Sequence, residues 1–433
     1  MATATIPPHA APTHAATHPG QAAHTTKSSR GKEHLPWSEG VWKTLDHTLM
    51  QEMMQTRVVS KFFPQFHVEA KEKSVEADVV TVPVAPAADP SLFIDESDTT
   101  RIQEYFATFR LSKAQVESEE REEMALSHQA ETSHPQESAG KDYHPEHTIR
   151  YQRASTAASL TTQTGNILAQ AEDLILLNGQ NAVANSALFQ GANAIVQSND
   201  PLLQQHLDYG LANINPTPAG GGGPDITVNP APGALGLVSV AQIIVVHPTV
   251  GAAGGAPPQY RENSLNAVAQ GVTVLQSFSH YENYALVLSS VPYADLHQAL
   301  VTTLIQPVEP ISHLVKAGVH GTGTLPPFAA PAGGGNGLPV TINGVALPGA
   351  AATGLVANWG AATQVLYTAL LVSLSGNNMD IVRGLMADNM HASVSFETKA
   401  AGGQSYFRAS QRFALRLKRR DAVILFLFVD TLN

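Results

Sequence analysis

The sequence predicts an α+β fold in which one sheet is built from segments far apart in the chain. A helical pattern from Thr148 to Asn178 would reach roughly 40 Å at about 1.5 Å per residue. Strand-like alternation occurs early, in Ile102 to Leu111, and again late, in Arg412 to Leu417. A helix–strand–helix unit lies between them, from Leu265 to Leu300.

The first 34 residues are a biased segment of Ala, Thr, His and Pro that cannot bury enough apolar area to offset the entropy of ordering. We expect this arm to be disordered unless a partner fixes it. Its bases Lys27, Arg30 and Lys32 make it basic, whereas the whole chain has a net charge of -11. A helix is then predicted to begin near Ser38. Its apolar face, spaced by three and four residues, consists of Trp42, Leu45, Leu49 and Met53.

Residues 69 to 84 look like a charged strand, and the prolines that follow are typical of an extended excursion rather than a central strand. The chain returns from this excursion through Ile102 to Leu111. Glu117 to Glu123 contains five acids in seven positions, which indicates a solvated insert or a helix end. The long helical pattern then follows, with Gly179 as its stop.

The second half alternates between loops and regular elements. Gly220 to Gly223 lacks the Lys and Ser/Thr of a phosphate loop, so we expect a flexible loop. A helix at Leu265 to Leu275, a buried strand at Tyr284 to Ser289 and a helix from Pro292 to Leu300 follow. After a Gly/Pro-rich stretch, 318 to 360, the final apolar segments close a sheet: 364 to 373, 392 to 396, 412 to 417 and 423 to 428.

Composition excludes several classes of protein. The 433 residues include no cysteine, so disulfides, thiolate zinc sites and iron–sulfur clusters are absent. With 25 basic and 36 acidic residues, the whole surface is not expected to grip nucleic acid. The longest apolar run, Ala422 to Val429, is shorter than the roughly 20 residues of a membrane span. We therefore expect no membrane association and a soluble protein made in the cytoplasm.

The sequence predicts no catalytic, metal or cofactor site. It lacks nucleophile-elbow, metalloprotease, dinucleotide and P-loop motifs. Glu172 and Asp173 point about 100° apart on a helix, so they are interpreted as a solvated face or an intersubunit contact. Two histidine groups could be read as metal ligands, but nothing sets the geometry of the first group and the second is a lone cluster without a supporting third ligand. They are His9, His14, His18, His24 and His34 in the arm, and His144 with Glu146 and His147. An enzyme with a concealed site remains an alternative.

Five segments, in order, resemble encapsulins, the linocin-like shell proteins. Residues 36 to 46 with 57 to 59 look like the N-terminal helix of that family, and 101 to 111 like the strand that ends its extended loop. Ala169 to Gly179, where an acidic pair precedes an apolar run and a glycine, is similar to the end of its spine helix. The remaining segments are similar to its axial-domain and closing strands: 284 to 300, 411 to 417 and 421 to 425.

This resemblance implies the major capsid fold that encapsulins share with tailed-phage capsid proteins, and a closed icosahedral shell of many copies. It divides the chain into consecutive regions. They are a flexible N-terminal arm, 1–34; an N-terminal helix region, 35–68; an extended loop and acidic insert, 69–147; a peripheral domain with the spine helix, 148–210; an axial domain with Gly/Pro-rich insertions, 211–380; and peripheral closing strands, 381–433.

Two kinds of shell remain open. The added arm and insertions favour the major capsid protein of a tailed-phage-type virus, a virion capsid assembled in the host cytoplasm around DNA. The alternative is an encapsulin, a cytoplasmic nanocompartment enclosing a cargo protein. The resemblance gives inner-face or cargo candidates: Lys27, Arg30, Lys32, Trp37 and Trp42. Leu92, Phe93 and Ile94 of the extended loop are expected to pack on a neighbouring subunit, without a covalent crosslink because no lysine lies between Val79 and Arg101.

Overall fold

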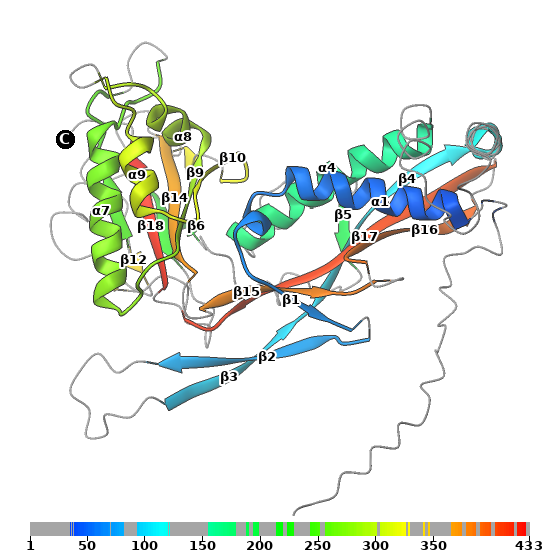
Figure 1. Cartoon of the computed structure of the whole chain (residues 1–433), viewed down its shortest axis with the longest axis horizontal. Coiled ribbons are helices and arrows are strands. Elements are labelled where there is room, and N and C mark those ends of the chain that lie inside the picture. The colour runs from blue at the N-terminus through cyan, green and yellow to red at the C-terminus, as the bar shows by residue number, and fades with distance from the viewer. Residues whose placement is uncertain are drawn as a thin grey trace, which may run out of the picture.

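Two six-stranded mixed sheets, each with helices on one face, a four-stranded sheet and a protruding hairpin are the main parts of the computed structural model (Figure 1). The structure describes 35, 37, 39–69, 71–81, 93–119, 121, 155–178, 188–189, 194–198, 214–219, 223–228, 243–251, 256–300, 304–325, 328–329, 341–342, 345–346, 365–374, 378–386, 390–399, 403–419 and 422–429.

The first sheet has the strand order β1-β15-β17-β4-β5, with β16 also paired to β17. Its longest strand, β17, is antiparallel to β15, β16 and β4, whereas β1 and β15 are parallel. The sheet therefore joins segments from both ends of the chain, as the sequence predicted. The strands are β1 (Gln65–Val68), β4 (Gln103–Ser112), β5 (Val196–Ser198), β15 (Met379–Gly384), β16 (Ala392–Lys399) and β17 (Gln404–Leu417).

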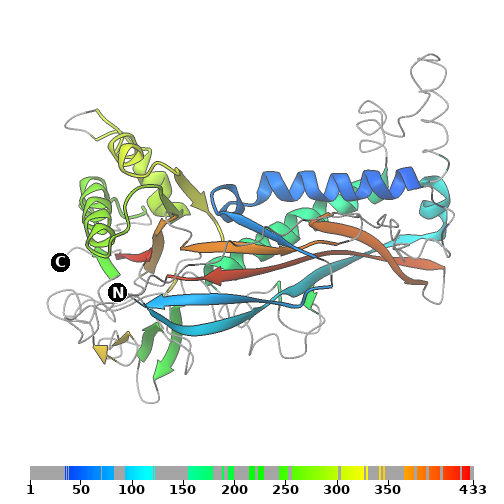
Figure 2. The same cartoon turned by 60° about the horizontal axis from the view of Figure 1, so that its bottom comes forward.

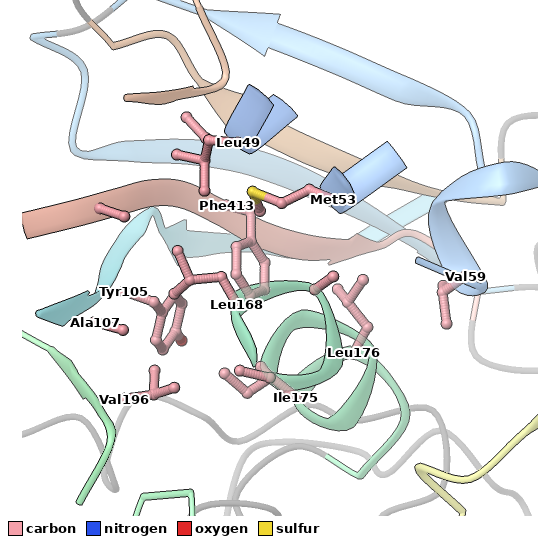
Figure 3. Close-up of a cluster of buried hydrophobic side chains, with 14 of the residues drawn as sticks. Leu49, Met53, Val59, Tyr105, Ala107, Leu168, Ile175, Leu176, Val196 and Phe413 are labelled. Atoms are coloured by element: carbon pink, nitrogen blue, oxygen red, sulfur yellow. The ribbon is translucent and has the colours of Figure 1, made fainter. Parts of the chain in front are cut away.

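Helices α1 (Glu39–Thr56) and α4 (Thr156–Asn178) pack together on one face of this sheet. The predicted apolar face of α1 is confirmed: Trp42, Leu45, Leu49 and Met53 are all fully buried. Figure 3 shows side chains of both helices meeting over Tyr105 and Phe413 of the sheet. The helices approach closely at Gly165, where a Cβ would lie 3.3 Å from the Leu49 carbonyl oxygen.

The side chains of Ser155 and Glu119 cap the start of α4. The Ser155 hydroxyl accepts a hydrogen bond from the Ala158 amide at 3.0 Å, and Glu119 accepts one from the Ala157 amide at 2.9 Å. Such caps satisfy amide groups that have no partner inside the helix. Residues 113–119 are helical. The sequence predicts a solvated insert or a helix end for the acidic run, and its described part is helical, with Glu119 buried as a cap rather than solvated.

Strands β2 (Ser74–Thr81) and β3 (Phe93–Arg101) form a two-stranded antiparallel sheet within the expected extended loop. Among the described strands, neither pairs with a strand of another sheet. The hairpin leaves the first sheet at Arg101, where the chain continues almost directly into β4, and in Figure 1 it lies below both six-stranded sheets. In the view of Figure 2 it runs below β17.

The second sheet has the order β10-β9-β14-β18-β8, with β11 paired to β14. Residues of its central strands alternate between two hydrophobic clusters. Leu286, Leu371 and Phe426 pack with the helices of this half, whereas Val287, Leu370 and Leu425 join the core of the first sheet. The elements are β8 (Ile243–Val246), α7 (Glu262–Ser277), β9 (Tyr284–Ser289), α8 (Ser290–Leu296), α9 (Val308–Leu314), β10 (Val319–Thr322), β11 (Phe328–Ala329), β14 (Val365–Ser373) and β18 (Val423–Val429).

Three expectations for this half need correction. Strand β18 pairs with β14 and β8, so residues 423–429 belong to the second sheet and not with the closing strands of the first. Helix α8 ends at Leu296 rather than Leu300. Part of the expected loop around Gly220 to Gly223 is a hairpin within a four-stranded sheet: β6 (Ile214–Ala219), β7 (Gly223–Val228), β12 (Thr341–Ile342) and β13 (Val345–Ala346).

Candidate functional site

A buried cluster of charged side chains lies where the turn after α1 meets α4 and the first sheet. Arg57 follows the last turn of α1, Glu172 and Asp173 lie on α4, and Arg383 lies on β15. Ser60 belongs to the short 3-10 helix η1 (Val59–Lys61). Three separate parts of the chain therefore supply this cluster.

Glu172 is the centre of the cluster and its side chain is fully buried. Arg383 Nη2 donates to Oε1 at 2.5 Å and Arg383 Nη1 to Oε2 at 3.2 Å. Arg57 Nε lies 2.8 Å from Oε2, and the Ser60 hydroxyl donates to Oε1 at 2.5 Å. A buried carboxylate held by two guanidinium groups has its desolvation cost offset by ion pairing and hydrogen bonding.

Asp173 has different partners because it points to another side of α4. Its carboxylate oxygens accept the backbone amides of Val58 at 2.7 Å and Val59 at 3.0 Å. Since these amides begin the 3-10 helix η1, Asp173 caps that helix from a distant part of the chain. Both acids therefore hold the turn after α1. Glu172 binds the side chains of Arg57 and Ser60, whereas Asp173 binds two backbone amides.

Two glutamines extend the cluster across the first sheet. Arg57 Nη2 donates to Gln411 Oε1 at 2.8 Å, and Gln411 Nε2 donates to the Leu168 carbonyl at 2.9 Å. On the other side, Arg383 Nε donates to Gln65 Oε1 at 2.8 Å. The network therefore ties β1, β15 and β17 to α4.

The charges of the cluster shift one another's pKa. Burial alone would raise the pKa of Glu172, but Arg383 and Arg57 outweigh it and lower this pKa to about 2. Burial, with the neighbouring Glu172, raises the pKa of Asp173 to about 7 against the opposing effect of the two amides. Burial lowers the pKa of Arg57 to about 10, so this residue stays cationic near neutral pH.

The interpretation of Glu172 and Asp173 as a solvated face or an intersubunit contact is wrong. Within one chain Glu172 is fully buried and Asp173 is 2% exposed, and both have partners in their own chain. The cluster therefore fixes the fold of the subunit, because neither carboxylate is open to a ligand. A signal for the missed partner exists in the sequence: Arg383 interrupts the apolar strand that contains Ile381 and Val382, and a buried arginine needs a buried acid.

Trp37 and Trp42, expected as inner-face or cargo residues, lie in the subunit's own core. Trp37 is 5% exposed and Trp42 is fully buried. The Trp37 ring stacks on Phe407 at a centroid separation of 4.9 Å, and its indole N–H donates to the Val116 carbonyl at 3.2 Å. Their side chains are therefore not available to a cargo peptide in this conformation, which corrects the expectation.

Several sequence candidates lie outside the described residues: Lys27, Arg30, Lys32, Leu92, the arm histidines, His144, Glu146 and His147. Phe93 and Ile94 begin β3, where they pair with Thr81 and Val80 of β2. The structure brings neither residue to the charge cluster.

Two histidine contacts flank the cluster. His67 on β1 and His391 stack with a centroid separation of 4.5 Å, and burial, with His67 and Arg383, lowers the pKa of His391 to about 4. Phe62, directly after η1, stacks on His320 of β10 at 4.5 Å. The same turn therefore contacts both sheets.

In the part of the chain that the structure describes, no three His, Cys, Asp or Glu side chains gather as a metal site, and no helix has the length and apolarity to cross a membrane.

No family model and no curated protein matches the chain. Several solved structures are similar to it. A virus-like particle protein from Pyrococcus furiosus is 11% identical with a TM-score of 0.45, and the match covers 89% of this chain and 99% of that one. The SrpI encapsulin from Synechococcus elongatus is 13% identical with a TM-score of 0.35, covering 85% of each chain.

A further match is the mature capsid of bacteriophage PhiM1, which is 10% identical with a TM-score of 0.34. That match covers 86% of this chain and 87% of the other. An encapsulin, the class that the sequence segments resemble, and a phage capsid, the class whose fold that resemblance implies, are thus both among the structures to which this chain is similar.

Proposed function

We propose that the chain is the subunit of a closed icosahedral shell built from many copies. The observation that carries this proposal is the β2–β3 hairpin, which leaves the body and pairs with no other described strand. An isolated two-stranded hairpin is at best marginally stable in water. A second subunit that covers it would remove this instability.

The rest of the subunit supports the same function. The buried cluster of Arg57, Glu172 and Arg383 fixes the turn from which β1 and then the hairpin continue. A rigid base lets the hairpin present the same geometry in every copy. Repeated head-to-tail contacts of this kind close into rings when the rotation permits.

Of the two shell classes, we propose the major capsid protein of a tailed-phage-type virus that encloses DNA. The long basic arm before α1 supports this choice, because packaged DNA is anionic and the chain as a whole is acidic. The second candidate is an encapsulin, which the resemblance of residues 36 to 46 to the encapsulin N-terminal helix favours. The function is structural in both cases.

Electron microscopy of the purified full chain tests the proposal. Hollow, uniform spherical particles are expected. A chain that stays monomeric at every protein and salt concentration would contradict the shell. Nuclease-protected DNA in native particles would support the capsid, whereas a co-purifying protein inside particles free of DNA would support the encapsulin.

A further inference from the structure

His67 and His391 form a stacked pair beside the edge strand β1 of the first sheet. Their ring centroids lie 4.5 Å apart and the ring planes differ by 18°. His67 is an exposed residue of β1, whereas His391 is half-buried and directly precedes β16. The stack therefore joins two segments that are far apart in the chain.

Charged groups from three other segments act on the His391 ring. Arg383 of β15 and Arg57 after α1 are cations, and Glu172 of α4 is an acid. Asp173, also on α4, is instead directed to the amides at the start of η1. With two guanidinium groups against one carboxylate, the ring of His391 lies in positive surroundings.

A proton on His391 is unfavourable in this arrangement for two reasons. Burial, followed by the charge of His67 and then of the two arginines, lowers the pKa of the ring to about 4. The Nδ1 atom of His391 is also buried, and it has no hydrogen-bond partner among the described residues. Because a protonated imidazole carries an N–H on both nitrogens, this atom would become a buried donor without an acceptor.

The sign of the pH dependence follows from the two states of the ring. A ring released to solvent has the ordinary pKa of 6.5, whereas the pKa of the stacked ring is about 4. Between these values the released state binds more protons than the stacked state. The stack is therefore fully favoured above pH 6.5 and loses stability as the pH falls towards 4.

Strand β1 is the element that the stack holds in place. It has four residues and, among the described strands, it pairs only with β15. The Ile381 amide donates to the Pro64 carbonyl at 2.9 Å, and the Leu385 amide donates to the Val68 carbonyl at 2.9 Å. Since a short edge strand has few hydrogen bonds, the loss of one side-chain contact changes how often it opens. The next strand along the chain is β2, so β1 also holds the entrance to the hairpin.

We propose that the His67–His391 pair is an acid-sensitive clasp, which holds β1 on the first sheet at neutral pH and releases it when the rings are protonated. Two stacked imidazolium rings repel each other, and Arg383 adds to the repulsion. Release of β1 changes how the hairpin is attached to its own subunit. The clasp is a property of a single chain, so it stands or falls independently of the proposed shell.

The other titrating acids of this region do not produce the same response. The pKa of Asp173 is about 7 in the folded chain, so this residue adds stability as the pH falls. The pKa of Glu172 is about 2, and this carboxylate keeps its charge at pH 5. A loss of β1 pairing between pH 7 and pH 5 therefore points to the histidines.

Amide hydrogen exchange of the full chain at pH 7 and pH 5, corrected for the intrinsic effect of pH on exchange, tests the clasp. The reporters are the amides of Ile381 and Leu385, because both donate to carbonyls at the ends of the β1 segment. We expect their protection to fall about tenfold between pH 7 and pH 5, a size discounted for the partial exposure of the His391 ring. The amides of β14 in the second sheet should keep their protection.

Three variants separate the charge of the rings from their packing. His391→Phe keeps an aromatic ring in the stack but takes no proton, so the reporters should be equally protected at both pH values. His67→Phe should show a smaller fall than the wild type, because burial and the arginines still act on His391. His313→Phe, at an exposed position of α9, is the matched control and should respond to pH like the wild type.

Equal protection of the reporters in the wild type at pH 7 and pH 5 would overturn the clasp. A fall in His391→Phe as large as that of the wild type would do the same. So would a fall that the amides of β14 share, because it would assign the response to unfolding of the whole subunit.

Discussion

At the scale of single residues, Glu172 and Asp173 differ in partners although they are adjacent. Glu172 neutralises two buried guanidinium groups, and Asp173 receives two backbone amides. Their positions on α4 differ by about 100°, and that rotation directs one side chain towards Arg383 and the other towards the start of η1. Each acid is satisfied within its own subunit.

Replacing Glu172 with Gln should destabilise the subunit strongly. The substitution leaves Arg57 and Arg383 buried without a countercharge, and breaking a buried ion pair costs about 3 to 5 kcal/mol. Urea unfolding followed by tryptophan fluorescence, to which the buried Trp37 and Trp42 contribute, would measure the loss. Glu309→Gln, at an exposed position of α9, is the matched control and should lie within about 0.5 kcal/mol of the wild type. Equal stability of the two variants would contradict the role of the cluster.

The raised pKa of Asp173 predicts a pH dependence with a definite sign. Its pKa is about 7 in the folded chain against an ordinary 3.8, so between these values the folded state binds more protons than the unfolded state. This residue therefore makes stability fall as pH rises from about 4 to 7. Glu172 acts at lower pH, where its contribution is lost as pH falls from 4.5 towards 2.

Asp173→Asn isolates this contribution, because the variant keeps the shape and loses the titration. Unfolding free energies measured at pH 5 and pH 8 should show a wild-type advantage over the variant that is larger at pH 5. His391, whose pKa is lowered to about 4, titrates in both proteins and cancels in the difference. A difference between the proteins that does not change with pH would refute the assignment.

At the scale of elements, close packing decides how α7 lies on the second sheet. A Cβ at Gly271 would lie 2.9 Å from Phe426 Cζ and 3.0 Å from Leu371 Cδ2. The helix can therefore approach β18 and β14 only because this position has no side chain. The predicted helix and strand at Leu265 to Ser289 are confirmed, but their spacing follows from this glycine.

Gly271→Ala should destabilise the chain although alanine is the better helix former by about 1 kcal/mol. Overpacking against Phe426 and Leu371 typically costs about 1 to 3 kcal/mol, which exceeds that gain. Thermal unfolding would measure the net effect. Gln270→Ala, on the exposed side of the same helix, should leave the melting temperature unchanged or raise it slightly. A melting temperature raised by Gly271→Ala would refute the close contact.

At the scale of the whole molecule, one turn links the two sheets. Ser60 and the amides of Val58 and Val59 bind α4, whereas Phe62 stacks on His320 of the second sheet. Hydrophobic residues of both sheets also share one cluster. These contacts favour a subunit that meets its neighbours as one body, with the hairpin as its projecting part.

Deleting residues 86 to 98 should prevent closure of a particle. The deletion removes the first part of β3 and the predicted neighbour contacts Leu92, Phe93 and Ile94, but it leaves both sheets and their helices intact. Soluble monomers or small rings are the expected products in light scattering and electron microscopy. Circular dichroism of the same sample would show that the subunit remains folded. Intact particles from this deletion would contradict the proposed role of the hairpin.

Sequence by itself determined the elements whose apolar residues repeat with a clear period. The face of α1, the strand Tyr284–Ser289 and the long helix before Asn178 all follow from such repeats, because periodicity records which side of an element is buried.

Only the tertiary structure decided which partners these elements take. Arg57, Glu172 and Arg383 are separated by more than 100 residues at each step, so their ion pairs leave no local pattern. The assignment of Val423–Val429 to the second sheet depends on strand pairing across the chain. Pairing of distant segments is a cooperative property of the folded molecule, and the residues of one segment alone do not specify it.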